Sequence, residues 1–202
     1  IGVLPECQRG GYISLLCKDV NKREDLKYWR PISLLNVDYK LLSKSLTNRL
    51  SKVMPLIVHY DQTCGVKGRS INDNVHLLRN IIDYVNSKNI HCAIISIDQS
   101  KAFDRVNHVY LWSLLAAYGF GENFIRWVKL LYTDIFSQVI VNGHISDKIN
   151  VSRSVRQGCG LSPLLYVLCI EPFAIQIRKD LHFSGLKTPL MDDECRITQY
   201  AD

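Results

Sequence analysis

The fold and the chemistry of this chain are set by residues 92–106, which read CAIISIDQSKAFDRV. Residues 92–97 form an apolar run of strand length, which predicts a buried β-strand. That strand would deliver Asp98 at its C-terminal end. Because a buried carboxylate is costly unless it is paired, bound to a metal or solvated, Asp98 is a candidate functional residue.

A second carboxylate follows another predicted strand. Residues 196–200 read RITQY, and Asp202 comes just after them. If this strand is the hairpin partner of the strand before Asp98, the two carboxylates form an oxygen-rich pocket for hard divalent cations. Two metal ions about 3.5–4 Å apart activate an attacking hydroxyl and stabilise the leaving oxygen in phosphoryl transfer. An Asp at a strand end also commonly forms a turn, so the pair alone leaves both interpretations open.

Outward from this stretch, helices separate a few strands, which predicts a chain of the α+β class. Upstream, a strand at 12–16 precedes a helix at 37–54, whose apolar residues recur at helical spacing and which Pro55 would end. One side of this helix is basic. The other expected elements are a polar loop at 61–70 leading into a helix, two amphipathic helices within 110–133, a hairpin at 137–151 around an Asn-Gly turn, and an apolar helix at 162–179.

The composition fits a globular protein with a polyanionic partner. The chain has 202 residues, 47% of them hydrophobic, and a formal net charge of +6. Its seven cysteines are odd in number and include no C-x-x-C pair, which argues against a disulfide framework or zinc site and favours a reducing compartment. No apolar run reaches the roughly 20 residues of a membrane span, and no signal-peptide pattern begins the chain.

Several motifs resemble, in the same order, those of reverse transcriptases from non-LTR retrotransposons. The stretch around Asp98 resembles their first catalytic motif, D-x-x-K-A-F-D. RQGCGLSP at 156–163 resembles their template-gripping motif, and QYAD at 199–202 resembles the start of their Y-A-D-D box. WRPIS at 29–33 and the DQ and GRS of 61–70 resemble their finger motifs. The resemblance covers nearly the whole chain.

The resemblance implies a polymerase right hand, with fingers in residues 1–90, a palm built on an antiparallel sheet with helices in residues 91–202, and no thumb. It implies an RNA-directed DNA polymerase, a nucleotidyltransferase that uses an RNA template, a DNA primer and dNTP. Two Mg²⁺ ions are expected, which Mn²⁺ could replace. Such enzymes are expected in the nucleus or the cytoplasm, without a membrane partner.

The family's catalytic roles carry over to three residues. Asp98 and Asp202 match the catalytic carboxylates and are expected to bind both metal ions. The backbone carbonyl of Gln99 is expected to assist them as a ligand.

Other matched positions are expected to contact nucleotide or template. Phe103 matches the aromatic residue under the incoming sugar, where its ring would exclude a 2′-hydroxyl and so favour dNTP over rNTP. From the pattern alone, Phe103 could instead be a core residue. Gln157 and Gly158 match residues beside the template and the nascent base pair, where a missing side chain permits close approach. Candidates for triphosphate or template contacts in the fingers are Arg30, Lys67 and Arg69.

The sequence departs from the family pattern in three ways. Cys64-Gly65 replaces the usual Gly-Phe, and Gly160 replaces the usual Pro. The second Asp of the box and the thumb do not follow Asp202, so we expect a truncated fragment that is inactive alone. LMDDE at 190–194 resembles a retroviral M-D-D box but lacks a preceding apolar strand, so we interpret it as a solvated acidic loop.

Two other classes of function stay open. A catalytically dead relic or nucleic-acid-binding module would bind RNA in a salt-dependent manner and be indifferent to Asp98→Asn. A hydrolase using the Asp pair would cut nucleic acid without dNTP, but no further base or metal ligand for it is evident in the sequence.

Overall fold

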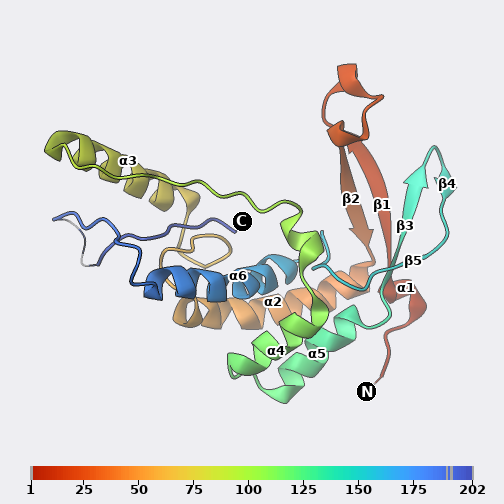
Figure 1. The fold of residues 1–202 in the computed structure, drawn as a ribbon. Helices are drawn as coiled ribbons and strands as arrows, with labels where there is room; N and C mark the ends of the chain where they lie inside the picture. Colours follow the sequence, from red (N-terminus) through yellow and green to blue (C-terminus); the bar gives the residue numbers. More distant parts are fainter. Residues whose placement is uncertain (1, 190, 192, 202) are drawn as a thin grey trace. The chain divides into compact units, whose positions relative to one another are not determined.

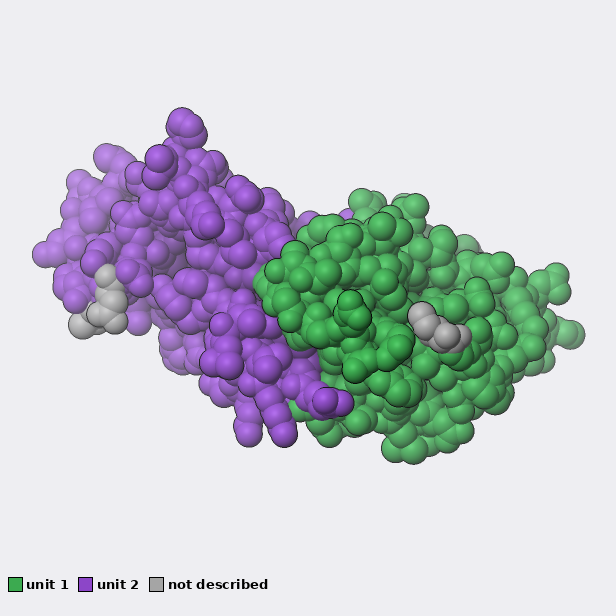
Figure 2. All heavy atoms as spheres, turned by 90° about the horizontal axis from the view of Figure 1, so that it is seen from below, with its two compact units in different colours: residues 1–48, 103–162 green, residues 49–102, 163–202 purple. Residues whose placement is uncertain are grey.

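The computed structural model describes residues 2–189, 191 and 193–201. It divides into two compact units, shown in Figure 2. Unit 1 comprises residues 1–48 and 103–162, and unit 2 comprises residues 49–102 and 163–202. Helices and a sheet occur together in the chain, so the predicted α+β class is confirmed.

Unit 1 contains a sheet whose described part has five strands (Figure 1). The order is β2 (Trp29–Leu35), β1 (Gly10–Cys17), β3 (Phe136–Val141) and β4 (His144–Ile145), and β5 (Ile149–Asn150) also pairs with β3. β1 lies antiparallel to β2 and parallel to β3. The predicted strand at 12–16 and the predicted hairpin are confirmed. The hairpin turns at Asn142 and Gly143, whose φ values of 50° and 78° suit the tight turn that an Asn-Gly pair favours.

The helices of unit 1 include the two predicted between 110 and 133. They are α4 (His108–Ala117) and α5 (Glu122–Tyr132), and the short α1 (Glu6–Arg9) leads into β1. The Asn107 side chain caps α4 by accepting a hydrogen bond from the Tyr110 amide. Three 3₁₀ turns complete this part of the chain, at Val20–Lys22, Leu26–Tyr28 and, across the boundary of the units, Ala102–Arg105. The buried apolar residues of unit 1 include Leu35, Tyr39, Leu111, Leu115, Val128, Leu131, Val155 and Leu161.

Helix α2 (Val37–Ile57) begins in unit 1 and ends in unit 2. The sequence predicted its end at Pro55, but the helix continues to Ile57. A proline removes one backbone donor and crowds the preceding turn. Pro55 lies in the last turn of α2, where few backbone hydrogen bonds remain to be made, so the helix tolerates the missing donor.

Unit 2 contains α3 (Ile71–Lys88) and all but the first residue of α6 (Ser162–Lys179). A capping box between Ser70 and Asp73 starts α3, and Asn89 ends it with a φ of 51°. The buried apolar residues of unit 2 include Leu50, Met54, Val58, Val66, Ile81, Leu165 and Leu168. No helix in the described part of the chain is both long and apolar enough to cross a membrane.

The strand predicted at 92–97 is absent, so this part of the expected antiparallel palm sheet was wrong. Residues 91–99, all described, are extended without pairing, and Ile95 and Ile97 are 76% and 68% exposed. The expected partner at 196–200 bonds elsewhere: the Gln199 amide donates to Asp61 O at 2.9 Å. An apolar run becomes a strand only when a neighbouring backbone satisfies its N–H and C=O groups.

Candidate active site

Asp98 lies in the extended segment 91–99 of unit 2 with its side chain exposed. Among the residues described, none forms a hydrogen bond or ion pair with this carboxylate. The next side chain is anchored, because the hydroxyl of Tyr166, a buried residue of α6, donates to Oε1 of Gln99. Carboxylate and carbonyl oxygens are the ligands that hard divalent cations prefer, so Asp98 and the backbone of Gln99 fit such an ion.

Asp202, the other predicted catalytic carboxylate, lies outside the described residues. The residues before it are held in unit 2 against the loop at 58–70: the Thr63 amide donates to Gln199 O at 3.0 Å. Across the described ranges, no group of three or more His, Cys, Asp or Glu side chains is arranged to hold a metal ion. The predicted metal ligands therefore remain predictions.

Phe103 and Gln157 are brought together in unit 1. The half-buried Phe103 accepts a backbone hydrogen bond from the Val155 amide at 2.9 Å. Gln157 lies two residues after Val155, and its side-chain amide is 3.4 Å from Oδ1 of Asp104. The structure thus joins the D-x-x-K-A-F-D stretch to the R-Q-G stretch, and it places one residue predicted to contact the sugar near one predicted to contact the template.

The R-Q-G turn itself is tightly packed. Gly158 has a φ of 79°, and a Cβ added there would lie 3.0 Å from the carbonyl oxygen of Ser33 in β2. Only glycine meets both requirements without strain. The Arg156 guanidinium lies over the ring of Tyr39 with its carbon 4.6 Å from the ring centroid, and Arg156 is 6% exposed. This cation–π contact anchors the residue that precedes Gln157.

One of the departures from the family pattern, at Gly65, has a structural explanation. Gly65 has a φ of 68°, which an Ala or Phe would adopt only with strain, so this loop requires glycine where the family usually has Phe. A Cβ at Gly160 would meet Thr47 Oγ1 at 3.5 Å, an ordinary contact.

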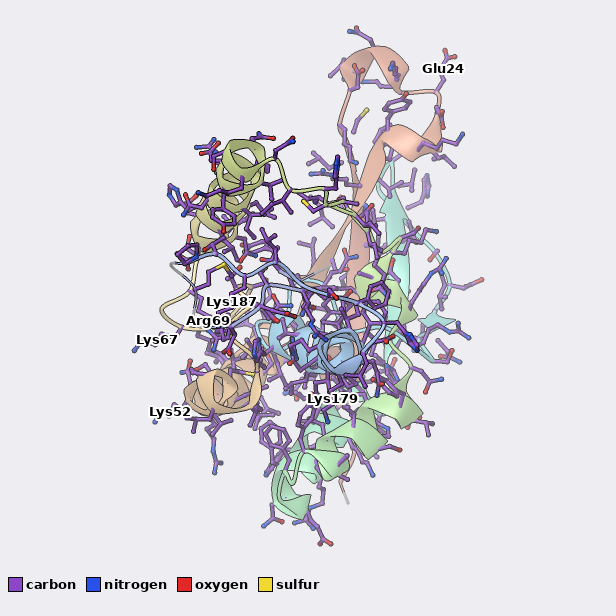
Figure 3. The ribbon with its side chains drawn as sticks, turned by 60° about the vertical axis from the view of Figure 1, so that its left-hand side comes forward. Glu24, Lys52, Lys67, Arg69, Lys179 and Lys187 are labelled. Atoms are coloured by element: carbon purple, nitrogen blue, oxygen red, sulfur yellow. The ribbon has the colours of Figure 1, made fainter. Side chains whose placement is uncertain are left out.

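The three basic candidates from the fingers are not equivalent. Arg30 is exposed in β2 of unit 1, whereas Lys67 and Arg69 belong to the loop of unit 2. In Figure 3, Lys67 points away from the ribbon and Arg69 lies within the loop. The Arg69 guanidinium donates to the carbonyl oxygens of Val58, His59 and Gln62 at 3.1, 2.6 and 2.9 Å. Arg69 thus holds the loop together, and Lys67 is the basic side chain of this loop left facing solvent.

The acidic stretch that resembles an M-D-D box behaves as predicted in its described part. Leu190 and Asp192 lie outside the described residues, and Asp193 and Glu194 are exposed. The guanidinium of Arg196 and the Gly185 amide donate to the Glu194 carboxylate, at 3.1 and 3.2 Å. The Arg196 hydrogen bond is the main cause that lowers the pKa of Glu194.

Three residues that contact the site were not singled out from the sequence. Gln62 and Asn74 bond to the segment before Asp202, and Tyr166 bonds to Gln99. Gln62 belongs to the DQ motif, so a signal for it existed. Asn74 and Tyr166 sit within helical patterns, and nothing local distinguishes them from surface or core residues.

The chain matches a known family over most of its length. The model of the family described as "Reverse transcriptase (RNA-dependent DNA polymerase)" matches residues 20–202. The chain is 41% identical over 201 residues to the "Transposon TX1 uncharacterized 149 kDa protein" of Xenopus laevis, covering 100% of this chain and 15% of that protein. It is 27% identical over 172 residues to the Pol polyprotein of the retrotransposable element R2DM of Drosophila melanogaster, covering 84% of this chain and 16% of that protein. The chain thus spans about a sixth of these relatives.

A solved structure shares the fold. Apo telomerase from Candida tropicalis, truncated from its C-terminal domain, superposes with a TM-score of 0.57 at 16% identity. The match covers 89% of this chain and 41% of the telomerase chain. At this identity the likeness concerns the fold alone.

Proposed function

The chain belongs to the reverse transcriptase (RNA-dependent DNA polymerase) family, and we propose that the protein it comes from copies RNA into DNA. The family assignment confirms the motif resemblance to retrotransposon reverse transcriptases. The proposed reaction adds a dNTP to the 3′-hydroxyl of a DNA primer on an RNA template. The observation that carries the proposal is the free, exposed carboxylate of Asp98 at the place where the family has its first catalytic Asp.

Reverse transcriptases generally use divalent metal ions, and the proposed ligands here are Asp98, Asp202 and the backbone carbonyl of Gln99. When two Mg²⁺ ions are bound, they activate the primer hydroxyl and stabilise the leaving oxygen. The chain's own contribution is to present these oxygen ligands. The bond from Tyr166 to the Gln99 side chain supports this role, because it holds the residue next to Asp98.

We assign recognition of the nucleotide and template to Phe103, Gln157 and Gly158. The Phe103 ring would lie under the sugar of the incoming nucleotide and exclude a 2′-hydroxyl. Gln157 and Gly158 would face the template beside the new base pair. Their support is the backbone hydrogen bond between Phe103 and Val155 and the tight turn at Gly158, both in unit 1.

For contacts with phosphate groups we favour Arg30 and Lys67 over Arg69. Both are exposed, and a lysine or arginine that faces solvent is free to neutralise a phosphate. The Arg69 guanidinium already serves three carbonyl oxygens, so its contribution is to the shape of the loop.

The remaining assignments rest on the family. We assign residues 1–90 to the fingers and residues 91–202 to the palm of a right-hand polymerase. The partners would be an RNA template and a DNA primer, which the net charge of +6 suits. The site of action would be the nucleus, where chromosomal targets are found.

Primer extension tests the proposal. The longer protein from which the chain comes is given an RNA template, an annealed DNA primer, dNTPs and Mg²⁺, and Asp98→Asn is compared in it with Asp147→Asn, the same change in an exposed segment of unit 1. Extension that Asp98→Asn abolishes and Asp147→Asn preserves is the expected result. Salt-dependent RNA binding without extension, equal in both variants, would instead support a binding module without catalysis.

A further inference from the structure

Two segments of unit 1 lie side by side, one after the D-x-x-K stretch and one leading into the R-Q-G stretch. The Val155 amide donates to the carbonyl oxygen of Phe103 at 2.9 Å, and the Ser154 amide donates to the carbonyl oxygen of Val106 at 2.8 Å. These two bonds hold the backbones next to each other. The side chains that follow Phe103 and Val155 are therefore brought within reach of one another.

Asp104 and Gln157 contact each other across these two segments. Nε2 of Gln157 donates to Oδ1 of Asp104 at 3.4 Å. Asp104 is exposed, and Gln157 is half-buried. The backbone is fixed on both sides of Gln157, by the contact of Arg156 with the Tyr39 ring and by the tight turn at Gly158. Within the described part of the chain, Asp104 is the residue that bonds to the Gln157 side chain.

The chemistry of the two groups decides which end of the Gln157 amide is left free. An ionised carboxylate only accepts hydrogen bonds, whereas a side-chain amide has an NH₂ group that donates and an oxygen that accepts. The Asp104 carboxylate therefore selects the NH₂ group and turns the oxygen of Gln157 away from itself. None of the residues described donates to this oxygen. The free end of Gln157 is thus an acceptor, which suits a partner that carries a donor.

We propose that Asp104 is a positioning residue, which orients the Gln157 amide so that its oxygen accepts a hydrogen bond from a sugar hydroxyl of the substrate. This inference rests on the proposed function, in which Gln157 lies beside the template and the nascent base pair.

A sugar hydroxyl is the donor that fits best. Phosphate oxygens are acceptors and would be repelled by the amide oxygen. Base amino groups do donate, but they differ from base to base, and a polymerase must copy all four bases. Sugar hydroxyls occur at every nucleotide: the RNA template carries a 2′-hydroxyl, which both donates and accepts, and an incoming dNTP carries a 3′-hydroxyl.

The test measures how strongly the longer protein that contains this chain prefers a substrate with the hydroxyl. The quantity is kcat/KM for the addition of one nucleotide to a DNA primer on an RNA template. Two templates differ only in the 2′-hydroxyl of the templating nucleotide, and two nucleotides differ only in the 3′-hydroxyl. Loss of one hydrogen bond to the oriented oxygen should lower kcat/KM by about five-fold. The pair that shows this preference identifies which hydroxyl is bound.

Three variants then test the role of Asp104. Asp104→Asn keeps the shape of the side chain but can donate to the Gln157 oxygen, so the amide turns and the preference should be lost. Combining Asp104→Asn with Gln157→Glu keeps the total charge. The introduced amide then donates to one oxygen of the introduced carboxylate and leaves the other free, so the preference should return. Asp147→Asn, the same change in an exposed segment of unit 1, should keep the preference.

The outcomes separate this inference from the proposed function. An equal preference in Asp104→Asn and Asp147→Asn would overturn the positioning role, and so would a double variant that does not regain the preference. Templated addition by the unmodified protein without preference for either hydroxyl would overturn the inference and leave the proposed function standing. If the unmodified protein shows no templated addition, the proposed function fails and the inference fails with it. Should Asp104→Asn lose its cooperative thermal unfolding, Asp104→Ala takes its place, because it also releases the Gln157 amide and should weaken the preference.

Discussion

The guanidinium carbon of Arg156 lies 4.6 Å from the centroid of the Tyr39 ring, and both residues are buried in unit 1. The contact joins α2 to the R-Q-G turn that is proposed to face the template. Nη1 and Nη2 of Arg156 have no hydrogen-bond partner among the residues described, so the ring is the main group that stabilises this buried charge.

Removing the Tyr39 ring is therefore predicted to destabilise the chain. Tyr39→Phe keeps the ring face and should change the free energy of unfolding by less than about 1 kcal/mol. Tyr39→Leu removes the cation–π contact and should lower it by about 2 kcal/mol more. Urea denaturation followed by circular dichroism measures both, and equal stabilities of the two variants would contradict a cation–π role for the ring.

A clash is predicted at Gly158 in addition to backbone strain. Gly158→Ala places a Cβ 3.0 Å from Ser33 O at a φ of 79°. Gly119 has nearly the same φ, 78°, with nothing within 4 Å of an added Cβ, so Gly119→Ala is a control for strain alone. Gly119→Ala should lower the free energy of unfolding by about 1 kcal/mol. Gly158→Ala should lower it by about 1 kcal/mol more. Thermal unfolding compares them, and a smaller loss in Gly158→Ala would show that the turn has room for a side chain.

The ionic cluster of unit 2 should be sensitive to the loss of Arg178. Its guanidinium bonds to Asp61 and to Glu171, which are 6% and 1% exposed. Arg178→Met removes the guanidinium from two buried carboxylates, of which Asp61 keeps, as a basic partner among the residues described, only Nδ1 of His59 at 2.8 Å, and should lower the free energy of unfolding by about 3–5 kcal/mol. Lys148→Met removes the partner of the exposed Glu6 and should have little effect. Denaturant midpoints that shift equally in the two variants would argue against a buried pair.

Thiol reactivity is predicted to differ within unit 2. Burial raises the pKa of Cys169 to about 12, whereas Cys92 is exposed. Because the thiolate is the reactive form, iodoacetamide at pH 8 should label Cys92 and leave Cys169 unmodified until the chain unfolds. Because the pKa of the Cys169 thiol is raised in the folded chain, the free energy of unfolding should fall as the pH rises above the ordinary pKa of a thiol. Mass spectrometry of the labelled peptides measures both reactions, and early labelling of the half-buried Cys169 would contradict its raised pKa.

The sequence predicted local structure better than pairing between distant segments. The helix of α2 and the Asn142-Gly143 hairpin follow from local spacing and turn chemistry, and both are present. The strand at 92–97 depended on a partner far along the chain, and the backbone of Gln199 bonds to the 61–63 segment instead. Local sequence carries no information about which backbone groups pair across such distances.

The same limit applies to the candidate site. The resemblance identified the family, because it depends on residue types in order, whereas the catalytic role that the motif gives Asp98 stays a prediction. The basic character of Arg69 suggested a ligand contact, but its guanidinium is used by carbonyl oxygens of the loop. Whether a charged side chain faces solvent or its own backbone is decided by the fold around it.

The central claim, templated DNA synthesis dependent on Asp98, is tested most directly by single-nucleotide addition. The longer protein that contains this chain is mixed with a DNA primer, an RNA template of defined sequence, Mg²⁺ and one dNTP at a time. We predict addition of only the dNTP complementary to the next template base, and none by the Asp98→Asn variant. Addition of any dNTP regardless of the template, or addition that survives Asp98→Asn, would contradict it.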